Sequence, residues 1–154
     1  MSELNAGLIG TELAEATFTV DREAIRRFAV AIDDPSPSYV DDATGRASAW
    51  GDIVAPPTFA VTLRDEEAYT TRFWAGLGVS MSQVLNAEVE LECIRPILPG
   101  CTYIARVRIA DLYEKRGKSG RLVFVKRETV IRQAVDAQVV AVLRHTNVVR
   151  EARG

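Results

Sequence analysis

An alternating segment in the second half of the chain, AEVELEC at residues 87–93, indicates how that half folds. Successive side chains of a β-strand point to opposite faces, so the pattern predicts a strand with one dry face and one wet face. The dry face carries Ala87, Val89, Leu91 and Cys93, and the wet face carries Glu88, Glu90 and Glu92. Similar patterns follow and predict three further strands, at residues 103–109, 122–131 and 138–149. The apolar run at residues 139–143 predicts burial on both faces of the last strand.

Short connections between these strands favour hairpins or a meander. They are a turn at Pro99 and Gly100, a polar loop at residues 114–120 that contains two glycines, and a turn at residues 133–137. Consecutive antiparallel strands that follow a helical half are typical of an α+β domain. We therefore expect one domain over residues 1–154, with its sheet in the C-terminal half.

The N-terminal half is predicted to be mainly helical after a short strand at residues 16–20. Asp21 offers a helix N-cap, and apolar residues at helical spacing predict a helix that Pro35 would end. That apolar stripe consists of Ile25, Phe28, Ala29 and Ile32. A loop at residues 33–42 and a second short helix at residues 43–50 would follow. A third helix, at residues 58–74, would begin after Pro56 and Pro57 and cover the sheet.

Composition excludes several classes of protein. The 154 residues have a formal net charge of −2 and no basic stripe of the kind that nucleic-acid-binding proteins carry. Apolar runs are too short to span a bilayer, and the N-terminus lacks the pattern of a secretory signal. The chain has two cysteines and one histidine, so a Cys/His metal cluster is not expected. We expect a cytoplasmic protein with reduced cysteines, no cofactor and no metal.

Two segments of the first half carry the functional information: DPSPSYVD at residues 34–41 and GDIVAPPTF at residues 51–59. Together they resemble the motifs of MaoC-like hydratases and dehydratases of the FAS1-like N-terminal type. The family motif runs roughly Gly-Asp-x-Asn-Pro-x-His-x-Asp and then Gly-x-Val-Ala-Pro. The segment RPILPG at residues 95–100 also resembles a family turn. The chain is similar in particular to accessory subunits of the actinobacterial (3R)-hydroxyacyl-carrier-protein dehydratase of fatty acid metabolism.

The resemblance implies a hot-dog fold, in which an antiparallel sheet wraps around a central helix, and a dimeric assembly. It implies acyl thioesters of coenzyme A or acyl carrier protein as substrates. In active members an aspartate and a histidine hold a water between them and move protons as water adds to or leaves the 2,3 bond. Backbone N–H groups near the start of the central helix polarise the thioester carbonyl.

The match at the catalytic positions is partial. Asp34 matches the catalytic aspartate, but Tyr39 stands where the family has histidine. A tyrosine hydroxyl ordinarily titrates near ~10, against ~6.5 for histidine, and so is a poor proton shuttle at neutral pH. The second segment implies a substrate-binding wall made of Val54, Ala55, Pro56 and Phe59. The only histidine, His145, is expected at the surface or at a strand end, with no chemical role.

Three functions are consistent with this pattern. The first is an accessory subunit of an (R)-specific enoyl-thioester hydratase or 3-hydroxyacyl-thioester dehydratase, paired with a catalytic MaoC-like chain. The second is a stand-alone homodimeric enzyme that uses Asp34 with Tyr39 or another group. The third is a non-catalytic acyl-thioester-binding module or a thioesterase. Arg116, Lys118 and Arg121 could meet a coenzyme A or carrier-protein phosphate, although a solvated loop accounts for them equally well.

Overall fold

The computed structural model describes residues 6–64, 73–117 and 120–150. The helical elements, with η denoting a 3-10 helix, are η1 (Ala6–Leu8), α1 (Arg22–Ala31), α2 (Pro37–Val40), α3 (Asp42–Ala47), η2 (Pro57–Thr62), α4 (Phe73–Gly76) and η4 (Met81–Gln83). The strands are β1 (Glu12–Thr19), β2 (Val84–Cys93), β3 (Thr102–Gly117), β4 (Gly120–Gln133) and β5 (Val139–Arg150). None of the helices within these ranges is long and apolar enough to cross a membrane.

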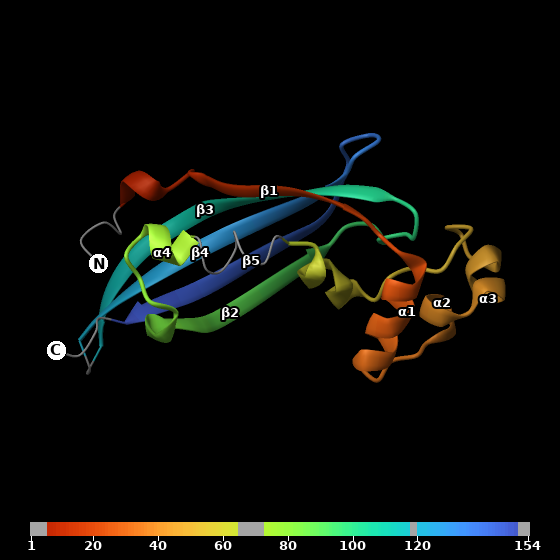
Figure 1. Cartoon of the computed structure of the whole chain (residues 1–154), viewed down its shortest axis with the longest axis horizontal. Coiled ribbons are helices and arrows are strands. Elements are labelled where there is room, and N and C mark those ends of the chain that lie inside the picture. Colours follow the sequence, from red (N-terminus) through yellow and green to blue (C-terminus); the bar gives the residue numbers. More distant parts are fainter. Residues whose placement is uncertain (1–5, 65–72, 118–119, 151–154) are drawn as a thin grey trace.

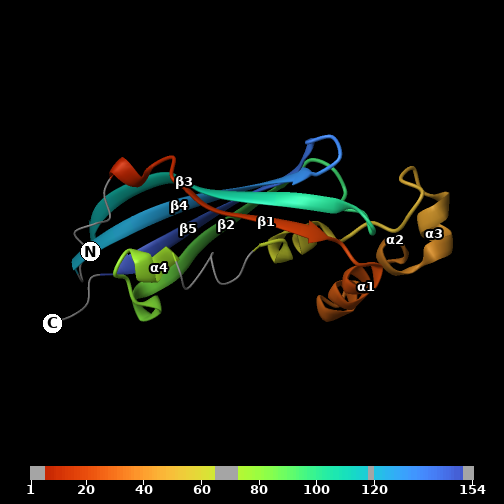
Figure 2. The same cartoon turned by 45° about the horizontal axis from the view of Figure 1, so that its top comes forward.

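The strands form one antiparallel sheet in the order β1-β3-β4-β5-β2. Strands β3, β4 and β5 follow one another as a meander, as predicted, and β1 and β2 form the two edges. The prediction is wrong for the connection at Pro99 and Gly100, because β2 pairs with β5, and the chain from β2 to β3 crosses toward the other edge strand instead of closing a hairpin. Figure 1 and Figure 2 show α1, α2 and α3 gathered at one end of the sheet. The α+β class and the four predicted C-terminal strands are therefore confirmed.

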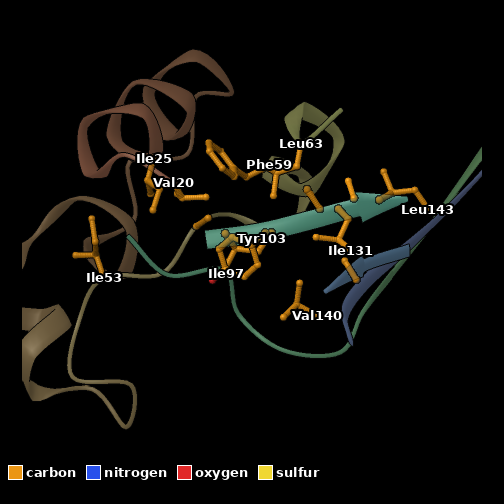
Figure 3. Packing of buried hydrophobic residues seen from close by; sticks show 14 residues of the cluster. Val20, Ile25, Ile53, Phe59, Leu63, Ile97, Tyr103, Ile131, Val140 and Leu143 are labelled. Carbon is orange, nitrogen blue, oxygen red and sulfur yellow. The ribbon is translucent and has the colours of Figure 1, made fainter. Parts of the chain in front are cut away.

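Two apolar clusters lie on one face of the sheet. In the first, Phe59, Ala60 and Leu63 from η2 and its C-cap pack with sheet residues that include Tyr103 and Ile131 (Figure 3). In the second, Trp74 of α4 packs with sheet residues Leu112, Val123, Val125 and Val149. Burying large apolar side chains stabilises a fold by roughly 1.5–3 kcal/mol each, so these clusters hold η2 and α4 against the sheet.

The predicted start of α1 is confirmed, because the Asp21 side chain accepts a hydrogen bond from the N–H of Ala24. The stripe is only partly confirmed. Ile25 and Ala29 are buried, whereas Ile32 is 43% exposed. The helix ends with Ile32 as its C-cap, and Asp33 adopts a positive φ of 58°. The helix therefore ends at the turn that Asp33 makes, and not at Pro35 as predicted.

Three predictions about local structure are wrong. Residues 37–40 form helix α2 where a loop was expected, because Pro37 occupies the first helical position, which suits its fixed φ. Residues 114–117 and 120 belong to β3 and β4, so the polar segment extends a hairpin. Residues 57–62 form a 3-10 helix and not the first turns of the predicted α-helix at residues 58–74. Residues 65–72 of that prediction lie outside the described part of the chain.

The predicted wet and dry faces of β2 are also partly wrong. A register shift between Asn86 and Glu88 marks Ala87 as an extra residue, so the alternation changes phase there. Glu88, Glu90 and Glu92 are exposed as predicted, but Val89 on the expected dry face is 52% exposed. Because β2 is an edge strand, only one neighbouring strand shields its side chains.

Candidate functional site

The two motif segments meet at the end of the sheet where α1, α2 and α3 lie (Figure 2). The N–H of Val54 donates to the carbonyl of Ser38 at 3.0 Å, which joins the second segment directly to α2. The N–H of Ala55 donates to the carbonyl of Ile97 at 2.8 Å, which joins it to the connection between β2 and β3. Residues far apart in sequence are thus brought together around Val54 and Ala55.

An ion-pair cluster fixes α1 against these segments. The Arg22 guanidinium donates to both carboxylate oxygens of Asp52 at 2.6 and 2.7 Å and to Asp42 at 2.8 Å. Arg26 contacts Asp42 at 2.7 Å and donates from Nε to the carbonyl of Val40 at 3.1 Å. Hydrogen bonding from Arg22 lowers the pKa of Asp52, which also accepts from the N–H of Ile53 at 2.7 Å.

A cavity of about 280 Å³ opens between α2, η2 and the β2–β3 connection. Four of its lining residues were predicted as site residues: Tyr39, Val54, Ala55 and Pro56. The remaining lining residues are Pro57, Ala60, Cys93, Ile94, Arg95, Pro96, Ile97 and Ala141. The lining is mostly apolar, as in pockets that bind small organic ligands.

The other two predicted site residues lie elsewhere. Asp34 is exposed and is not among the residues that line the cavity. Phe59 is buried in the core, where its ring meets the ring of Phe28 edge to face, with centroids 5.4 Å apart. Phe59 therefore supports the cavity wall from behind rather than forming part of it.

Backbone donors near the cavity are limited. The N–H groups of Val54 and Ala55 are both engaged within the protein, and that of Phe59 donates to the carbonyl of Pro56 at 2.9 Å. Proline has no N–H, so Pro56 and Pro57 cannot donate. Within residues 54–59, this leaves Thr58 as the position whose N–H could polarise a bound carbonyl.

The titratable side chains that line the cavity, among the described residues, are Tyr39, Cys93 and Arg95. Burial raises the pKa of the Cys93 thiol, which therefore stays protonated at neutral pH, and its Sγ donates to the carbonyl of Pro57 at 3.8 Å. Neither a carboxylate nor an imidazole is present in this lining. The cavity can hold an apolar ligand, but its described walls offer no group suited to proton transfer at pH 7.

His145 is not where the sequence predicted. It lies within β5, is only 7% exposed and lines a different cavity on the sheet. Burial, together with the charges of Arg127 and Arg64, lowers its pKa to about 4. The histidine is therefore neutral at pH 7 and lies outside the cavity that contains Tyr39.

The prediction of site residues from the sequence did not include residues 93–97, which form one wall of the cavity. The segment RPILPG resembles a family turn, but a connection between strands carries no sequence signal that it lines a pocket. Ile94 and Arg95 are fixed there because both N–H groups donate to the carbonyl of Val140, at 2.9 and 3.1 Å. Among the described residues, no group of three or more His, Cys, Asp or Glu side chains could hold a metal ion.

A family model described as FAS1-like, dehydratase domain region, matches residues 7–142. A protein of Saccharopolyspora erythraea named UPF0336 protein is 34% identical over 115 residues, which cover 74% of each chain. The matched regions span 55–74% of the length of five such relatives.

Two solved structures from Mycobacterium tuberculosis share the fold. One is the HadBC (3R-hydroxyacyl-ACP dehydratase) complex, with a TM-score of 0.76, 21% identity and coverage of 92% of this chain and 96% of the other. The second is the ChsH1–ChsH2 complex, with a TM-score of 0.71, 22% identity and coverage of 93% and 86%. These likenesses confirm the expected hot-dog fold.

Proposed function

The chain belongs to the FAS1-like, dehydratase domain region family, and we propose that it is an accessory subunit of an (R)-specific enoyl-thioester hydratase or 3-hydroxyacyl-thioester dehydratase. In this role the chain shapes the acyl-binding site, and a second hot-dog subunit supplies the aspartate and the histidine. The substrate is an acyl thioester of coenzyme A or of acyl carrier protein.

The composition of the cavity wall carries this proposal. Adding water to a 2,3 double bond requires one group to take a proton and another to return it. The described lining offers the Tyr39 hydroxyl, the Cys93 thiol and the Arg95 guanidinium, none of which does this readily at pH 7. The only histidine of the chain lies in a different cavity, which supports a second subunit as the source of the proton-transfer groups.

The cavity also suits an acyl chain. Val54, Ala55, Pro56, Ala60 and Ile97 give it apolar walls, so an aliphatic chain gains free energy on entry at roughly 25 cal/mol per Å² of buried apolar surface. The Thr58 N–H lies at the N-terminal end of η2, beside Pro57 of the wall, where it would polarise the thioester carbonyl. In this proposal Val54, Ala55 and Pro56 contact the substrate, and Phe59 supports them from the core.

The solved structures lend support to a two-chain assembly. HadBC and ChsH1–ChsH2 are each complexes of two named chains, and both have folds that match this chain over more than 90% of its length. A stand-alone enzyme that uses Asp34 with Tyr39 has less support, because Asp34 is exposed and lies outside the cavity lining.

Reconstitution tests the proposal. The chain is expressed alone, and also together with a MaoC-like chain that retains both aspartate and histidine, and hydration of crotonyl-coenzyme A is followed for each. We expect no rate above background from the chain alone, co-purification of the two chains, and turnover by the complex. Asp34→Asn in this chain should leave kcat of the complex within about twofold, since a removed catalytic acid–base group typically costs ~100-fold or more.

Tyr39→Phe is the matched control within the cavity. It removes the hydroxyl and keeps the ring, so a role in packing predicts an unchanged kcat and a role in proton transfer predicts its loss. Turnover by the pure chain that Asp34→Asn abolishes would show that the chain is itself a hydratase and that the accessory role is wrong.

A further inference from the structure

One wall of the cavity that contains Tyr39 is an irregular segment, residues 94–98, which we call the wall segment. It lies between β2 and β3 and belongs to no helix or strand. Residues 94–97 of this segment line the cavity. Because the wall segment has no place in the ladder of the sheet, its position depends on individual hydrogen bonds to the elements around it.

Backbone groups hold the wall segment at two points. The N–H groups of Ile94 and Arg95 both donate to the carbonyl of Val140 on β5, at 2.9 and 3.1 Å. The N–H of Ala55 donates to the carbonyl of Ile97 at 2.8 Å, which joins the segment to the second motif segment. These bonds join main-chain atoms, so the side chains at these positions do not make them.

A side chain holds the segment at a third point. The N–H of Leu98 donates to the hydroxyl oxygen of Tyr103 at 2.8 Å. Tyr103 belongs to β3 and is only 1% exposed, and it packs in the first apolar cluster together with Ile97 (Figure 3). The hydroxyl therefore connects the C-terminal end of the wall segment to the core of the domain.

The Tyr103 hydroxyl has a fixed orientation. Burial raises its pKa to about 12, so the group is neutral at physiological pH. It shares a second hydrogen bond with the side chain of Cys101, and the Sγ of Cys101 accepts from Nε2 of Gln133 at 3.8 Å. A buried hydroxyl with a partner on each side is worth more than a single pair, because each bond orients the next.

We propose that Tyr103 is a positioning residue for the acyl cavity, which acts through the N–H of Leu98 to keep the wall segment in contact with the bound acyl chain. This inference rests on the proposed function, because it takes the ligand to be an acyl thioester. A gap of ~0.5–1 Å between two apolar surfaces already forfeits a quarter to a half of their dispersion attraction. A wall that is fixed to the core therefore gains more from each methylene of the ligand than a wall that can move away.

The dependence of affinity on chain length measures this contact. Calorimetric titration of the chain compares butyryl- and hexanoyl-coenzyme A, which are saturated and cannot be hydrated. Each buried methylene should raise the affinity about fourfold, so the ratio between the two ligands should be about 15 in the wild-type protein. We expect Tyr103→Phe to reduce this ratio to about 4, since up to half of the contact is lost. A general loss of stability would lower both affinities alike and leave the ratio unchanged.

Two further variants separate the hydroxyl from its surroundings. Tyr113→Phe is the matched control, because Tyr113 lies on the same strand but stacks on Phe124, with ring centroids 4.9 Å apart, and does not line the cavity. It should keep the wild-type ratio. Cys101→Ala removes one partner of the Tyr103 hydroxyl and leaves the bond to Leu98, so we expect a ratio between those of the wild type and Tyr103→Phe.

Amide hydrogen exchange tests the same contact without a ligand. If the Tyr103 hydroxyl positions the whole wall segment, Tyr103→Phe should speed exchange at Leu98 and also at Ala55, whose N–H donates to Ile97. We expect an increase of at least about tenfold at Ala55, and no change there in Tyr113→Phe.

Three results would overturn the positioning role: a wild-type ligand ratio in Tyr103→Phe, a larger loss of this ratio in Cys101→Ala than in Tyr103→Phe, or faster exchange that is confined to Leu98. The last result would show that the wall segment keeps its place without the hydroxyl. Absence of acyl-coenzyme A binding by the wild-type chain would instead contradict the proposed substrate class. The exchange at Ala55 would then decide the positioning role by itself.

Discussion

His145 shows how a single buried residue links pH to stability. Its pKa is lowered to about 4 in the folded protein, whereas an unfolded histidine titrates near ~6.5. The folded state therefore binds the proton less readily, so the contribution of His145 is complete above pH ~6.5 and is lost as the pH falls toward 4.

We predict that His145→Gln flattens this dependence. The free energy of unfolding of the wild-type protein should fall, relative to that of His145→Gln, by ~2 kcal/mol between pH 7 and pH 5, because each pH unit in this window contributes up to ~1.4 kcal/mol. Urea unfolding of both proteins at several pH values measures the difference. Carboxylates titrate in both proteins and cancel, so parallel curves would contradict the assigned burial of the imidazole.

Gly45 is a second residue with a testable role, since it lets α3 approach the second motif segment. A Cβ at this position would lie 2.4 Å from the backbone nitrogen of Ile53 and 2.7 Å from the carbonyl carbon of Asp52. Backbone atoms cannot rotate away, so we predict that Gly45→Ala destabilises the protein by ~1–3 kcal/mol. Ala43→Ser, at an exposed site on the same helix, should change stability by less than ~0.5 kcal/mol. Chemical denaturation compares the two, and similar small effects would contradict the close approach.

At the scale of elements, the contact between α1 and the second motif segment depends on the bidentate salt bridge between Arg22 and Asp52. The Arg22 side chain is 37% exposed and that of Asp52 is 31% exposed, so solvent screens the pair in part. We predict that Asp52→Asn costs ~1 kcal/mol at pH 7. Because Arg22 lowers the pKa of Asp52, this contribution is present above the usual carboxyl pKa and is lost as the pH falls below it.

Arg22→Lys is the matched variant for this pair. It keeps the positive charge but loses the planar fork that reaches both oxygens of Asp52. We expect it to lose most of the stability that Asp52→Asn loses, as measured by thermal unfolding at pH 7. Full retention of stability by Arg22→Lys would show that charge alone, without the fork geometry, holds α1 in place.

The elements that were predicted well are those in which buried and exposed residues alternate without interruption. Alternation along β3 placed Tyr103, Ala105, Val107 and Ile109 on one face, and all four are buried. Failures occurred where the backbone departs from a period. Register shifts after Asn86 in β2 and after Ile109 in β3 each reverse the phase, and no residue type marks them in advance.

The candidate site was predictable only in part for a related reason. Tyr39, Val54, Ala55 and Pro56 belong to contiguous motifs and do line one cavity. His145 was misjudged because its place on the buried face of β5 depends on pairing with β4 and β2, and not on its neighbours in sequence. Arg127 and Thr129 occupy the same alternate positions of β4 as Val123, Val125 and Ile131, and this pattern is a sequence signal for polar side chains on the buried face.

At the scale of the molecule, the edges of the sheet are unequal. Exposed large apolar side chains gather on or beside β2: Met81, Leu85, Val89 and Ile94, with exposures of 43–52%. Such side chains at an edge strand favour association with another chain. This agrees with the proposed pairing of the chain with a second hot-dog subunit or with a copy of itself.

We predict that Leu85→Lys weakens this association, because it replaces an exposed apolar side chain of the edge strand with a charge that would have to be buried on assembly. Val135→Lys is the control, since Val135 is 83% exposed in the turn that precedes β5, whereas Leu85 pairs with Val148 near the opposite end of β5. Sedimentation velocity over a range of concentrations compares both with the wild type. An assembly that Val135→Lys dissociates, and that Leu85→Lys leaves intact, would place the interface elsewhere.

The extra residue at Ala87 has a consequence for how this chain should be aligned with its relatives. Asn86 and Glu88 face opposite sides of the sheet, although a strict two-residue period would place them on the same side. Deleting Ala87 would preserve both pairings, Asn86 with Asn147 and Glu88 with Thr146, and would remove only the bulge. A relative without this residue should therefore require a one-residue gap at position 87 and show unbroken alternation along the whole strand. An ungapped alignment would compare inward-facing with outward-facing positions on one side of that point.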